Sequence, residues 1–365
     1  MAGRDWRRSL VDLTITNCAD LESILPHEHL WPICTSLQSL SIDGCDKLST
    51  LPDAQHNLHY LKYFEVEHCR NLRSFPSIQG IASFLQRLQI SCGDEVLPTG
   101  LQSCISLQYL CIFNCPHLKQ IPDLRNFHSL TQLIIGECSS LIAIPDLNEL
   151  PSLTQFVIWD CSNLLLIPDL KELSSLTKLT IFGCPNLKSI PDIRELHFLT
   201  DLDIRKCQKL TRVTDSLDFL TRLKRLWIGD FCKELNSFPS LNSIQHSLKE
   251  LHLYGWASLN SLPKEIQCFT ALQSLEISGF DEMNTLPEWL GNLSSLQRLY
   301  IYNCKKLMYL PKMQAMRCLS KLEQLSICNC PKLEERCSEG SGAEWSKIAH
   351  IPIFTTNSMT IRKYS

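Results

Sequence analysis

Long apolar segments are absent from this 365-residue sequence. No run of about eighteen consecutive apolar residues occurs, and a membrane-spanning helix needs a run of roughly that length. The N-terminal residues carry arginines and reach Asp12 without the apolar segment that a secretory signal contains. The sequence therefore predicts a cytoplasmic protein without a membrane partner.

An excess of positive charge is also absent. The chain has 35 Lys and Arg residues against 38 Asp and Glu residues, which gives a formal net charge of −3. Nucleic acids and anionic membrane surfaces are held largely by an excess of basic side chains. We therefore expect a protein partner and no nucleic acid.

The short motifs that mark common active sites are missing as well. The sequence has no Gly-x-x-x-x-Gly-Lys phosphate loop, Gly-x-Ser-x-Gly elbow, His-Glu-x-x-His zinc helix or Gly-x-Gly-x-x-Gly turn. Its eleven histidines are scattered mostly through predicted loops, where a histidine is more often a solvated surface residue than a catalyst. We predict that the protein is not an enzyme and binds no cofactor.

One short unit is repeated along the whole chain instead. Its pattern is Leu-x-x-Leu-x-Ile-x-x-Cys-x-x-Leu-x-x-Ile-Pro, and four clean copies lie 23 residues apart, from Leu107, Leu130, Leu153 and Leu176. About fourteen units of 22 to 27 residues match the period of leucine-rich repeats. The units begin at Leu10, Leu37, Leu61, Leu85, Leu107, Leu130, Leu153, Leu176, Leu199, Leu223, Leu248, Leu272, Leu296 and Leu322.

The pattern of each unit predicts a strand followed by a short return. The Leu-x-Ile stretch alternates apolar and polar residues, as a strand with one buried face does. The return has room only for turns, 3-10 or one-turn helices, which Asp123, Asp146, Asp169 and Asp192 could cap. A single unit cannot bury its own leucines, so stability must come from stacking neighbours. The predicted fold class is an α/β solenoid, a leucine-rich-repeat horseshoe with one parallel β-sheet on the concave face.

The repeats also define the domain organisation. We expect an N-terminal extension over residues 1–9, the solenoid over 10–336, and a C-terminal cap and tail over 337–365. In the cap, Trp345, Ile348 and Ile351 would contact the last repeat. Two units are irregular, around 91–98 and around 229–239, where Cys232 leaves the repeat register. Such irregularities could bend the array or reflect drift.

Most of the nineteen cysteines occupy one position of the unit. Leucine-rich repeats usually place asparagine or cysteine there, to bond backbone groups left free where the strand turns. A zinc site would need closely spaced cysteine pairs, whereas these cysteines lie a whole repeat apart. We predict reduced structural thiols and no metal. The residues are Cys18, Cys45, Cys69, Cys115, Cys138, Cys161, Cys184, Cys207, Cys304 and Cys330.

The strand residues between the core positions should point outward onto the concave face. They include many aromatic and charged residues, and aromatic and arginine side chains are enriched in protein interfaces. Neighbouring aromatics on a sheet can also simply stack on one another. We predict a protein-binding stripe, preceded by Glu65 and Glu67. The stripe is Tyr109, Phe113, Trp159, Phe182, Asp201, Asp203, Arg205, Arg225, Trp227, Glu250, His252, Tyr254, Tyr300 and Tyr302.

Three features together resemble the leucine-rich-repeat region of plant nucleotide-binding (NB-LRR) disease-resistance proteins of the coiled-coil class. They are the unit itself, the spacers Leu262-Pro-Lys-Glu-Ile266 and Leu286-Pro-Glu-Trp-Leu-Gly-Asn-Leu293, and the ending. The ending is Cys330-Pro-Lys-Leu-Glu-Glu-Arg-Cys337, followed by Glu344-Trp-Ser-Lys-Ile-Ala-His-Ile-Pro352.

This resemblance implies a segment of an intracellular plant immune receptor. Such a segment senses a pathogen effector or a guarded host protein, and restrains the nucleotide-binding domain of the same receptor. The coiled coil and the nucleotide-binding motifs of the family do not occur in this sequence.

Two other functions stay open at this point. A leucine-rich-repeat substrate adaptor of a ubiquitin ligase also carries cysteine in its repeats, but this sequence has no F-box ahead of the repeats and no Ile-Thr-Asp step after the cysteine. An extracellular receptor would show a signal peptide and paired cap cysteines, which are lacking. A free-standing protein-binding scaffold is the simplest alternative.

Overall fold

The computed structural model describes residues 9–24, 35–51, 58–73, 75–91, 93, 95, 97–211, 215–231, 239–255 and 261–362. The chain forms two compact units, Met1–Leu187 and Lys188–Ser365. The predicted N-terminal extension over 1–9 and the two irregular units at 91–98 and 229–239, with Cys232, lie wholly or partly outside the described residues. Within the described ranges, no helix has the length and apolar content needed to cross a bilayer.

The first unit is a ladder of short strands in sequence order. Each strand pairs in parallel with the next one along the chain. The segments between them are turns, with the 3-10 helix η3 (Leu101–Ser103) among the described residues. The strands are β1 (Asp12–Thr16), β2 (Ser39–Asp43), β3 (Tyr63–Glu67), β4 (Arg87–Ile90), β5 (Tyr109–Phe113), β6 (Gln132–Gly136), β7 (Gln155–Trp159) and β8 (Lys178–Phe182).

The second unit repeats this plan with longer returns. Its strands are β9 (Asp201–Cys207), β10 (Arg225–Phe231), β11 (Glu250–Tyr254), β12 (Ser274–Ser278), β13 (Arg298–Tyr302), β14 (Gln324–Cys328), β15 (Ile353–Thr356) and β16 (Thr360–Arg362). Strands β9 to β15 pair in parallel with one another in sequence order, and β16 runs antiparallel to β15. Its helices are η4 (Asp215–Phe219), η5 (Asn242–Ile244), η6 (Lys264–Cys268), η7 (Glu288–Asn292), α1 (Met313–Cys318), α2 (Pro331–Arg336) and α3 (Trp345–Ile348).

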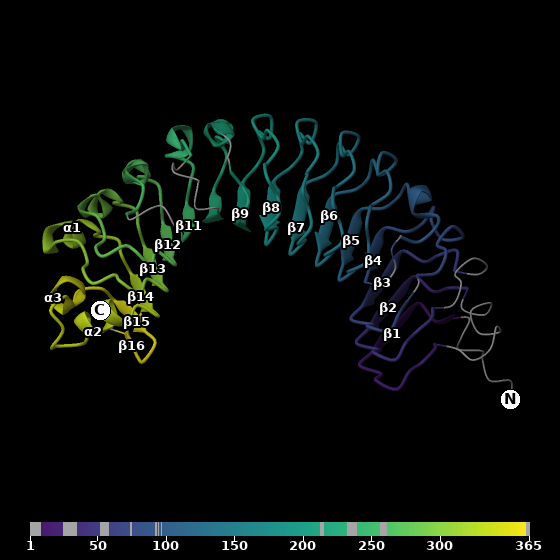
Figure 1. Cartoon of the computed structure of the whole chain (residues 1–365), viewed down its shortest axis with the longest axis horizontal. Helices are drawn as coiled ribbons and strands as arrows, with labels where there is room; N and C mark the ends of the chain where they lie inside the picture. Colours follow the sequence, from purple (N-terminus) through teal and green to yellow (C-terminus); the bar gives the residue numbers. More distant parts are fainter. Residues whose placement is uncertain are drawn as a thin grey trace. The chain divides into compact units, whose positions relative to one another are not determined.

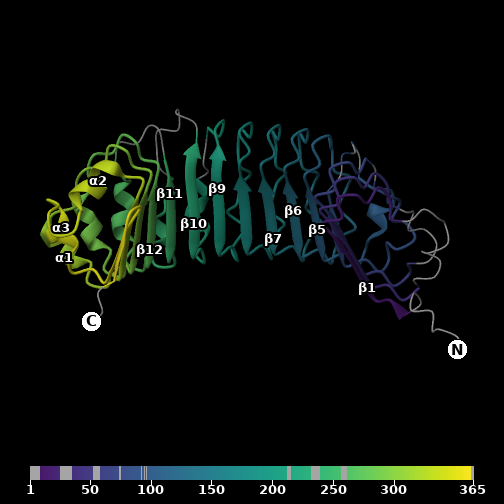
Figure 2. The same cartoon turned by 90° about the horizontal axis from the view of Figure 1, so that it is seen from below.

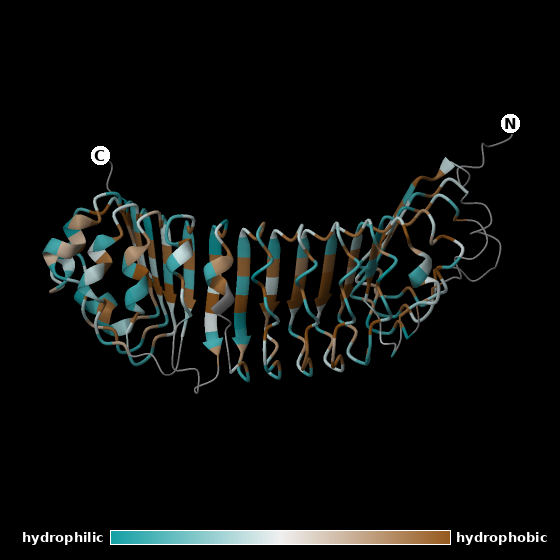
Figure 3. Ribbon diagram, turned by 90° about the horizontal axis from the view of Figure 1, so that it is seen from above, coloured by the Kyte–Doolittle hydropathy of each residue, from teal (hydrophilic) through white to brown (hydrophobic). Residues whose placement is uncertain are grey.

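Within each unit, the strands stand side by side on one face and the returns lie on the opposite face (Figures 1 and 2). The core fills the space between them, because the second and fourth residues of a strand such as β2 point inward and are buried. Figure 3 shows the resulting alternation of hydrophilic and hydrophobic bands along the strands. The period-two pattern of the sequence thus sets which side of each strand is covered.

Aspartates after the prolines cap turns rather than helices in the first unit. The carboxylate of Asp169 accepts a hydrogen bond from the backbone amide of Lys171 at 3.1 Å. Asp123 and Asp146 accept the same bond from the backbone amides of Arg125 and Asn148. A side-chain oxygen that accepts from the second residue after it forms a turn of its own.

Twelve of the sixteen strands end in or beside a residue with positive φ. The left-handed conformation costs most residues about 1–2 kcal/mol, and Gly, Asn and Asp tolerate it best. The amide of this residue donates to the carbonyl that ends the next strand, for example from Asn114 to Gly136 at 3.0 Å and from Asp160 to Phe182 at 2.9 Å. These residues are Asn17, Gly44, His68, Asn114, Glu137, Asp160, Gly183, Lys206, Asp230, Gly279, Asn303 and Asn329.

The repeated cysteines follow these turns directly. Each Sγ donates to the carbonyl oxygen two residues earlier at 3.2 to 3.6 Å. Burial raises the pKa of Cys69 and of Cys184 to about 11, which keeps both thiols protonated as donors at neutral pH. All ten are free thiols, and only Cys18, in the first repeat, is exposed. The thiols thus close the strand turn from inside the core.

The C-terminal segment extends the ladder of the second unit. β15 pairs in parallel with β14, and Ile348, Ile351 and Phe354 of this segment are buried. Trp345 contacts Phe354 edge to face, with ring centroids 5.9 Å apart. This segment therefore joins the core through its apolar residues and the sheet through its backbone.

A buried carboxylate ties this segment to the repeat before it. Glu344 accepts the backbone amide of Leu310 at 2.9 Å and the Lys347 ammonium at 2.7 Å, and Arg336 lies 3.7 Å away. Glu344→Ala should therefore lower the local stability of the C-terminal segment by about 2–4 kcal/mol, since it leaves the buried Leu310 amide without its acceptor and removes the carboxylate that pairs with Lys347.

Hydrogen exchange of the full chain measures this effect. Amides of β15 and β16 should exchange faster in Glu344→Ala, while Glu339→Ala, at an exposed position nearby, should change nothing. Equal exchange in the two variants would show that Glu344 does not hold the segment.

Candidate protein-binding face

The fourteen residues predicted to bind a partner lie at alternating positions of their strands. The first, third and fifth residues of β7, β11 and β13 are partly exposed, whereas the second and fourth are buried. Strand register places the outward residues side by side, so Trp227 lies between Asp203 of β9 and His252 of β11. We call the surface of these outward residues the open face. That these fourteen residues bind a partner stays a prediction.

The open face of the first unit carries a cluster of apolar side chains on β6 to β8, bordered by Gln132, Gln155 and the exposed Lys178. Ile134, Val157, Trp159 and Phe182 are all partly exposed there and lie on neighbouring strands. The indole of Trp159 rests against Gly136, where a β-carbon would overlap the ring. The glycine therefore allows the tryptophan to lie across its neighbouring strand.

The two aromatic residues of β5 are packed more tightly. The guanidinium of Arg87 lies over the ring of Tyr109, 3.5 Å from its centroid, and burial raises the pKa of Tyr109 to about 12. Phe113 is only 7% exposed and contacts the His68 ring. These side chains support the face more than they project from it.

Acidic residues dominate the open face on β2 and β3. Arg87 forms an ion pair with Glu65, and the amide of Gln89 donates to Glu67. Burial raises the pKa of Glu67, and the nearby charge of Asp43 raises it further. The region therefore holds more carboxylate than cationic charge.

Asp43, Glu67 and His68 also offer three metal-ligand atoms, all within 4.8 Å of one another. The Nδ1 atom of His68 lies 2.8 Å from Asp43 and 3.8 Å from Glu67. In the ranges that the structure describes, this is the one such group of His, Cys, Asp and Glu side chains. His68 is well exposed, and exposed acidic groups are common in proteins without a metal.

Ion pairs hold the open face of the second unit at β9 and β10. Arg205 makes two hydrogen bonds of 2.6 Å to Asp203, and Arg225 pairs with Asp201. Burial lowers the pKa of Arg205, but the hydrogen bond and charge of Asp203 outweigh it and raise the pKa overall. The guanidinium lies over the Tyr254 ring at 4.5 Å. These charges are largely neutralised within the face.

A second group links β10, β11 and β12. The rings of Trp227 and His252 stack at 4.9 Å and 14°, and His252 Nδ1 is 2.9 Å from a carboxylate oxygen of Glu276. Burial alone would raise the pKa of Glu276, but the hydrogen bond and charge of His252 lower it overall. The other ring nitrogen of His252 is buried and has no hydrogen-bond partner among the described residues.

Tyrosines continue the face on β13. The rings of Tyr300 and Tyr302 stack at 6.0 Å and 24°, and burial raises the pKa of Tyr302 to about 12. Glu250, on β11, lies 3.8 Å from Arg298. Both tyrosines are partly exposed, so their edges are available to a partner.

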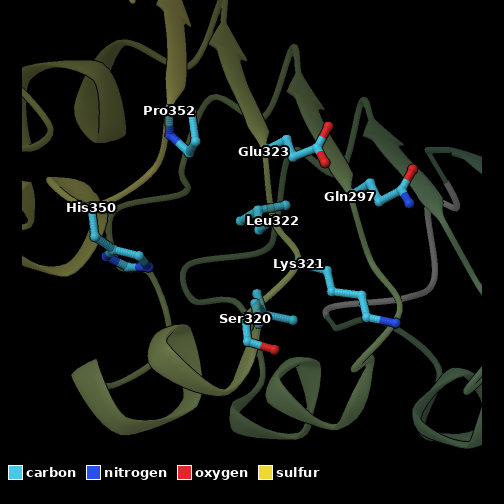
Figure 4. Close-up of a pocket in the computed structure, with 8 residues that line it drawn as sticks. Gln297, Ser320, Lys321, Leu322, Glu323, His350 and Pro352 are labelled. Carbon is cyan, nitrogen blue, oxygen red and sulfur yellow. The ribbon is translucent and has the colours of Figure 1, made fainter. Parts of the chain in front are cut away.

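A separate hollow of about 400 Å³ lies where β14 and β15 begin. Figure 4 shows Ser320, Lys321, Leu322 and His350 around it, with Pro352 at its rim. The backbone at its edge is already paired, since the amide of Ile353 donates to Glu323.

Comparison with known proteins identifies the architecture. Residues 264–330 match a family model described as R13L1/DRL21 LRRs. A leucine-rich-repeat protein of Leptospira interrogans is 23% identical, with a TM-score of 0.56, over 89% of this chain and 91% of that chain. The fold is a leucine-rich-repeat solenoid.

Two further solved structures share the fold. The functional domain of InlJ from Listeria monocytogenes, which includes a cysteine ladder, is 19% identical with a TM-score of 0.55, over 89% of this chain and 69% of that one. The Drosophila Toll–Spätzle complex matches at 16% identity and a TM-score of 0.60, over 95% of this chain and 50% of that one. The predicted fold class, with parallel strands opposite turns and short helices, is confirmed.

Two residues of the leucine-rich-repeat face escaped the sequence analysis. Glu276 is the third residue of β12 and so follows the same alternation as the predicted residues, which could have revealed it. Gly136 has no side chain to attract notice, although its place at the end of β6 marks it as outward. Glu276 contacts His252, on which Trp227 stacks, and Gly136 leaves the space that the Trp159 indole occupies. Each of the two residues therefore positions an aromatic neighbour.

Gly136→Ala should displace the Trp159 indole without unfolding the chain, because the added β-carbon occupies the space of the ring. Tryptophan fluorescence checks this, with Trp159→Phe identifying the contribution of that residue. We expect a red shift in Gly136→Ala and none in Gly93→Ala, whose β-carbon would make only ordinary contact with Leu72. An unchanged spectrum in Gly136→Ala would contradict the placement of the indole.

Glu276→Gln should destabilise the second unit by about 1.5–3 kcal/mol at pH 7, where the carboxylate accepts a hydrogen bond from His252. The folded pKa of Glu276 lies below its ordinary value of 4.5. Its stabilising contribution is therefore complete above that value and is lost as the pH falls through the lower, folded pKa.

Denaturant unfolding between pH 7 and pH 3 measures the difference in the free energy of unfolding between the wild type and this variant. We expect the difference to shrink toward acid, and Glu250→Gln, at a more exposed ion pair, to show little difference at any pH. A difference that grows toward acid would reverse the assigned sign.

Proposed function

We propose that this chain is the recognition part of an intracellular plant immune receptor and binds protein through the open face. The observation that carries the proposal is the way aromatic and arginine side chains are fixed on that face. Arg205 is held between Asp203 and Tyr254, and Trp227 is stacked on His252. Side chains fixed before binding lose less entropy when a partner docks.

The fold supports a role in binding rather than in catalysis. Leucine-rich-repeat solenoids serve as scaffolds for protein interaction, and the Toll–Spätzle complex is one example among proteins of this fold. The receptor setting rests on the match of residues 264–330 to the R13L1/DRL21 repeats and on the resemblance of the repeat spacers and ending to plant NB-LRR proteins. The partners proposed are a pathogen effector or a guarded host protein, and the nucleotide-binding domain of the same receptor.

The transcript upstream of Met1 tests the receptor setting. We expect an in-frame Gly-x-x-x-x-Gly-Lys-Ser/Thr loop there, because such a loop would provide the nucleotide-binding domain that the repeats restrain. A stop codon directly upstream in the same frame would contradict this setting, and the chain would be a free-standing protein-binding scaffold.

Substitution of Trp159, Trp227 and Tyr254 by alanine should weaken partner binding at least about tenfold, since large aromatic side chains carry much of the energy of protein interfaces. Proteins captured by the chain from pathogen-challenged tissue are purified, and the Kd of each is measured with the wild type and the variant. Circular dichroism checks that the triple variant remains folded.

A matched control is available outside the strands. Phe198, Phe219 and Tyr309 are exposed aromatics of the returns, and each lies beneath an arginine. Their triple alanine variant should bind as the wild type does. Binding that is lost in this control and kept in the first variant would move the interface to the return side.

A further inference from the structure

The open face of the first unit has an apolar part and an acidic part. Ile134, Val157, Trp159 and Phe182 lie on β6 to β8, and the acidic residues lie on β1 to β3. Because strands follow one another in register, the two parts belong to one continuous ladder. A single extended partner could therefore contact both.

The apolar part has no charged side chain at the outward positions of β6 and β7, and Lys178 lies at the first position of β8. The outward residues of β6 and β7 are Gln132, Ile134, Gly136, then Gln155, Val157 and Trp159. The indole spreads over the gap at Gly136, so its face lies along the sheet. Such a surface suits large aliphatic or aromatic side chains.

The acidic part has too few cations for its carboxylates. The outward positions of β1 to β4 carry Asp12, Asp43, Glu65 and Glu67, but only one guanidinium, that of Arg87. Arg87 pairs with Glu65 and covers the Tyr109 ring, and Glu67 accepts from the neutral amide of Gln89.

Asp43 and Glu67 converge on one imidazole nitrogen. His68 Nδ1 lies 2.8 Å from the first carboxylate and 3.8 Å from the second. Burial first and the charge of Asp43 second raise the pKa of Glu67, while the charge of His68 lowers it, as expected for two like charges that share one imidazole. A positive charge placed beside them would relieve the repulsion between the two carboxylates.

We propose that the open face of the first unit docks a protein segment that carries large apolar side chains at one end and a lysine or arginine at the other. The apolar side chains contact Trp159 and its neighbours, and the basic side chain reaches Asp43 and Glu67. This inference rests on the proposed function, that the open face binds protein. The same carboxylates disfavour a polyanion or an anionic membrane as the occupant.

The spacing of the strands sets the length of this segment. From β3 to β7 there are four interstrand steps of about 4.8 Å, or about 19 Å in all. An extended segment covers that distance in about six residues at roughly 3.3 Å each, and a helix in about thirteen at roughly 1.5 Å each. The basic residue and the apolar anchor should therefore be separated by one of these intervals.

Selection from a displayed library of random peptides, each about fifteen residues long, tests the proposal on the full 365-residue chain. The selection is run at low salt, where charge pairing is strongest, and with chelator present so that no metal ion occupies the carboxylates. We expect enriched peptides that combine Trp, Phe, Leu or Ile with Lys or Arg at the stated interval.

Variants of the chain show which part of the open face contacts each end of a selected peptide. Trp159→Ala should weaken its Kd about tenfold. The double variant Asp43→Asn with Glu67→Gln should weaken it several-fold and remove most of its salt dependence. Leu166→Ala, at a residue 59% exposed outside the strands, and Glu195→Gln, on an exposed return, should leave the Kd unchanged.

Several outcomes would overturn the inference. They are a failure to enrich any peptide, enrichment of acidic peptides, an unchanged Kd in the double carboxamide variant, and Zn²⁺ that displaces the basic peptides at micromolar concentration. Peptides that depend on Trp227 and Tyr254 instead of Trp159 would overturn this inference and leave the proposed function standing. Peptides that depend on residues of the returns alone would count against both.

Discussion

The hydrogen bond that closes most of the strands is the interaction on which the rest of this solenoid depends. A left-handed residue turns the chain, and its amide donates to the carbonyl that ends the next strand, as Asn114 does to Gly136. The following thiol donates back to the strand that has just ended, as Cys115 does to Phe113. Each repeat is thereby fixed to its neighbour, and the stability of each unit is a sum of such local steps.

This regular backbone is what makes an ordered binding face possible. Strand register brings outward side chains from neighbouring repeats into contact, and those contacts fix their rotamers. The stack of Trp227 on His252 exists only because their strands are paired in register. The same holds for Trp159 over Gly136. The face is therefore prepared before any partner arrives, which lowers the entropy that binding costs.

The sequence predicted the fold and the outward positions because both follow from period and alternation. It could not predict how far each outward side chain is covered, since that depends on neighbours in other repeats. Phe113 is nearly buried, whereas Trp159 is partly exposed, although both are the fifth residue of a strand. β15 was not expected either, because Ile353–Thr356 lacks the pattern of the unit. Its β-branched and aromatic residues favour a strand, and pairing with β14 adds it to the sheet.

The central claim is that partners dock on the open face, and site-specific photo-crosslinking tests it most directly. A photoreactive phenylalanine analogue is placed at Thr180 or Tyr300 on the open face, or at Ile142 or Phe198 on the returns, and the full chain is expressed in cells of its own organism. The account predicts protein adducts from the two open-face positions, with few from the returns. Adducts formed mainly from Ile142 or Phe198 would contradict it.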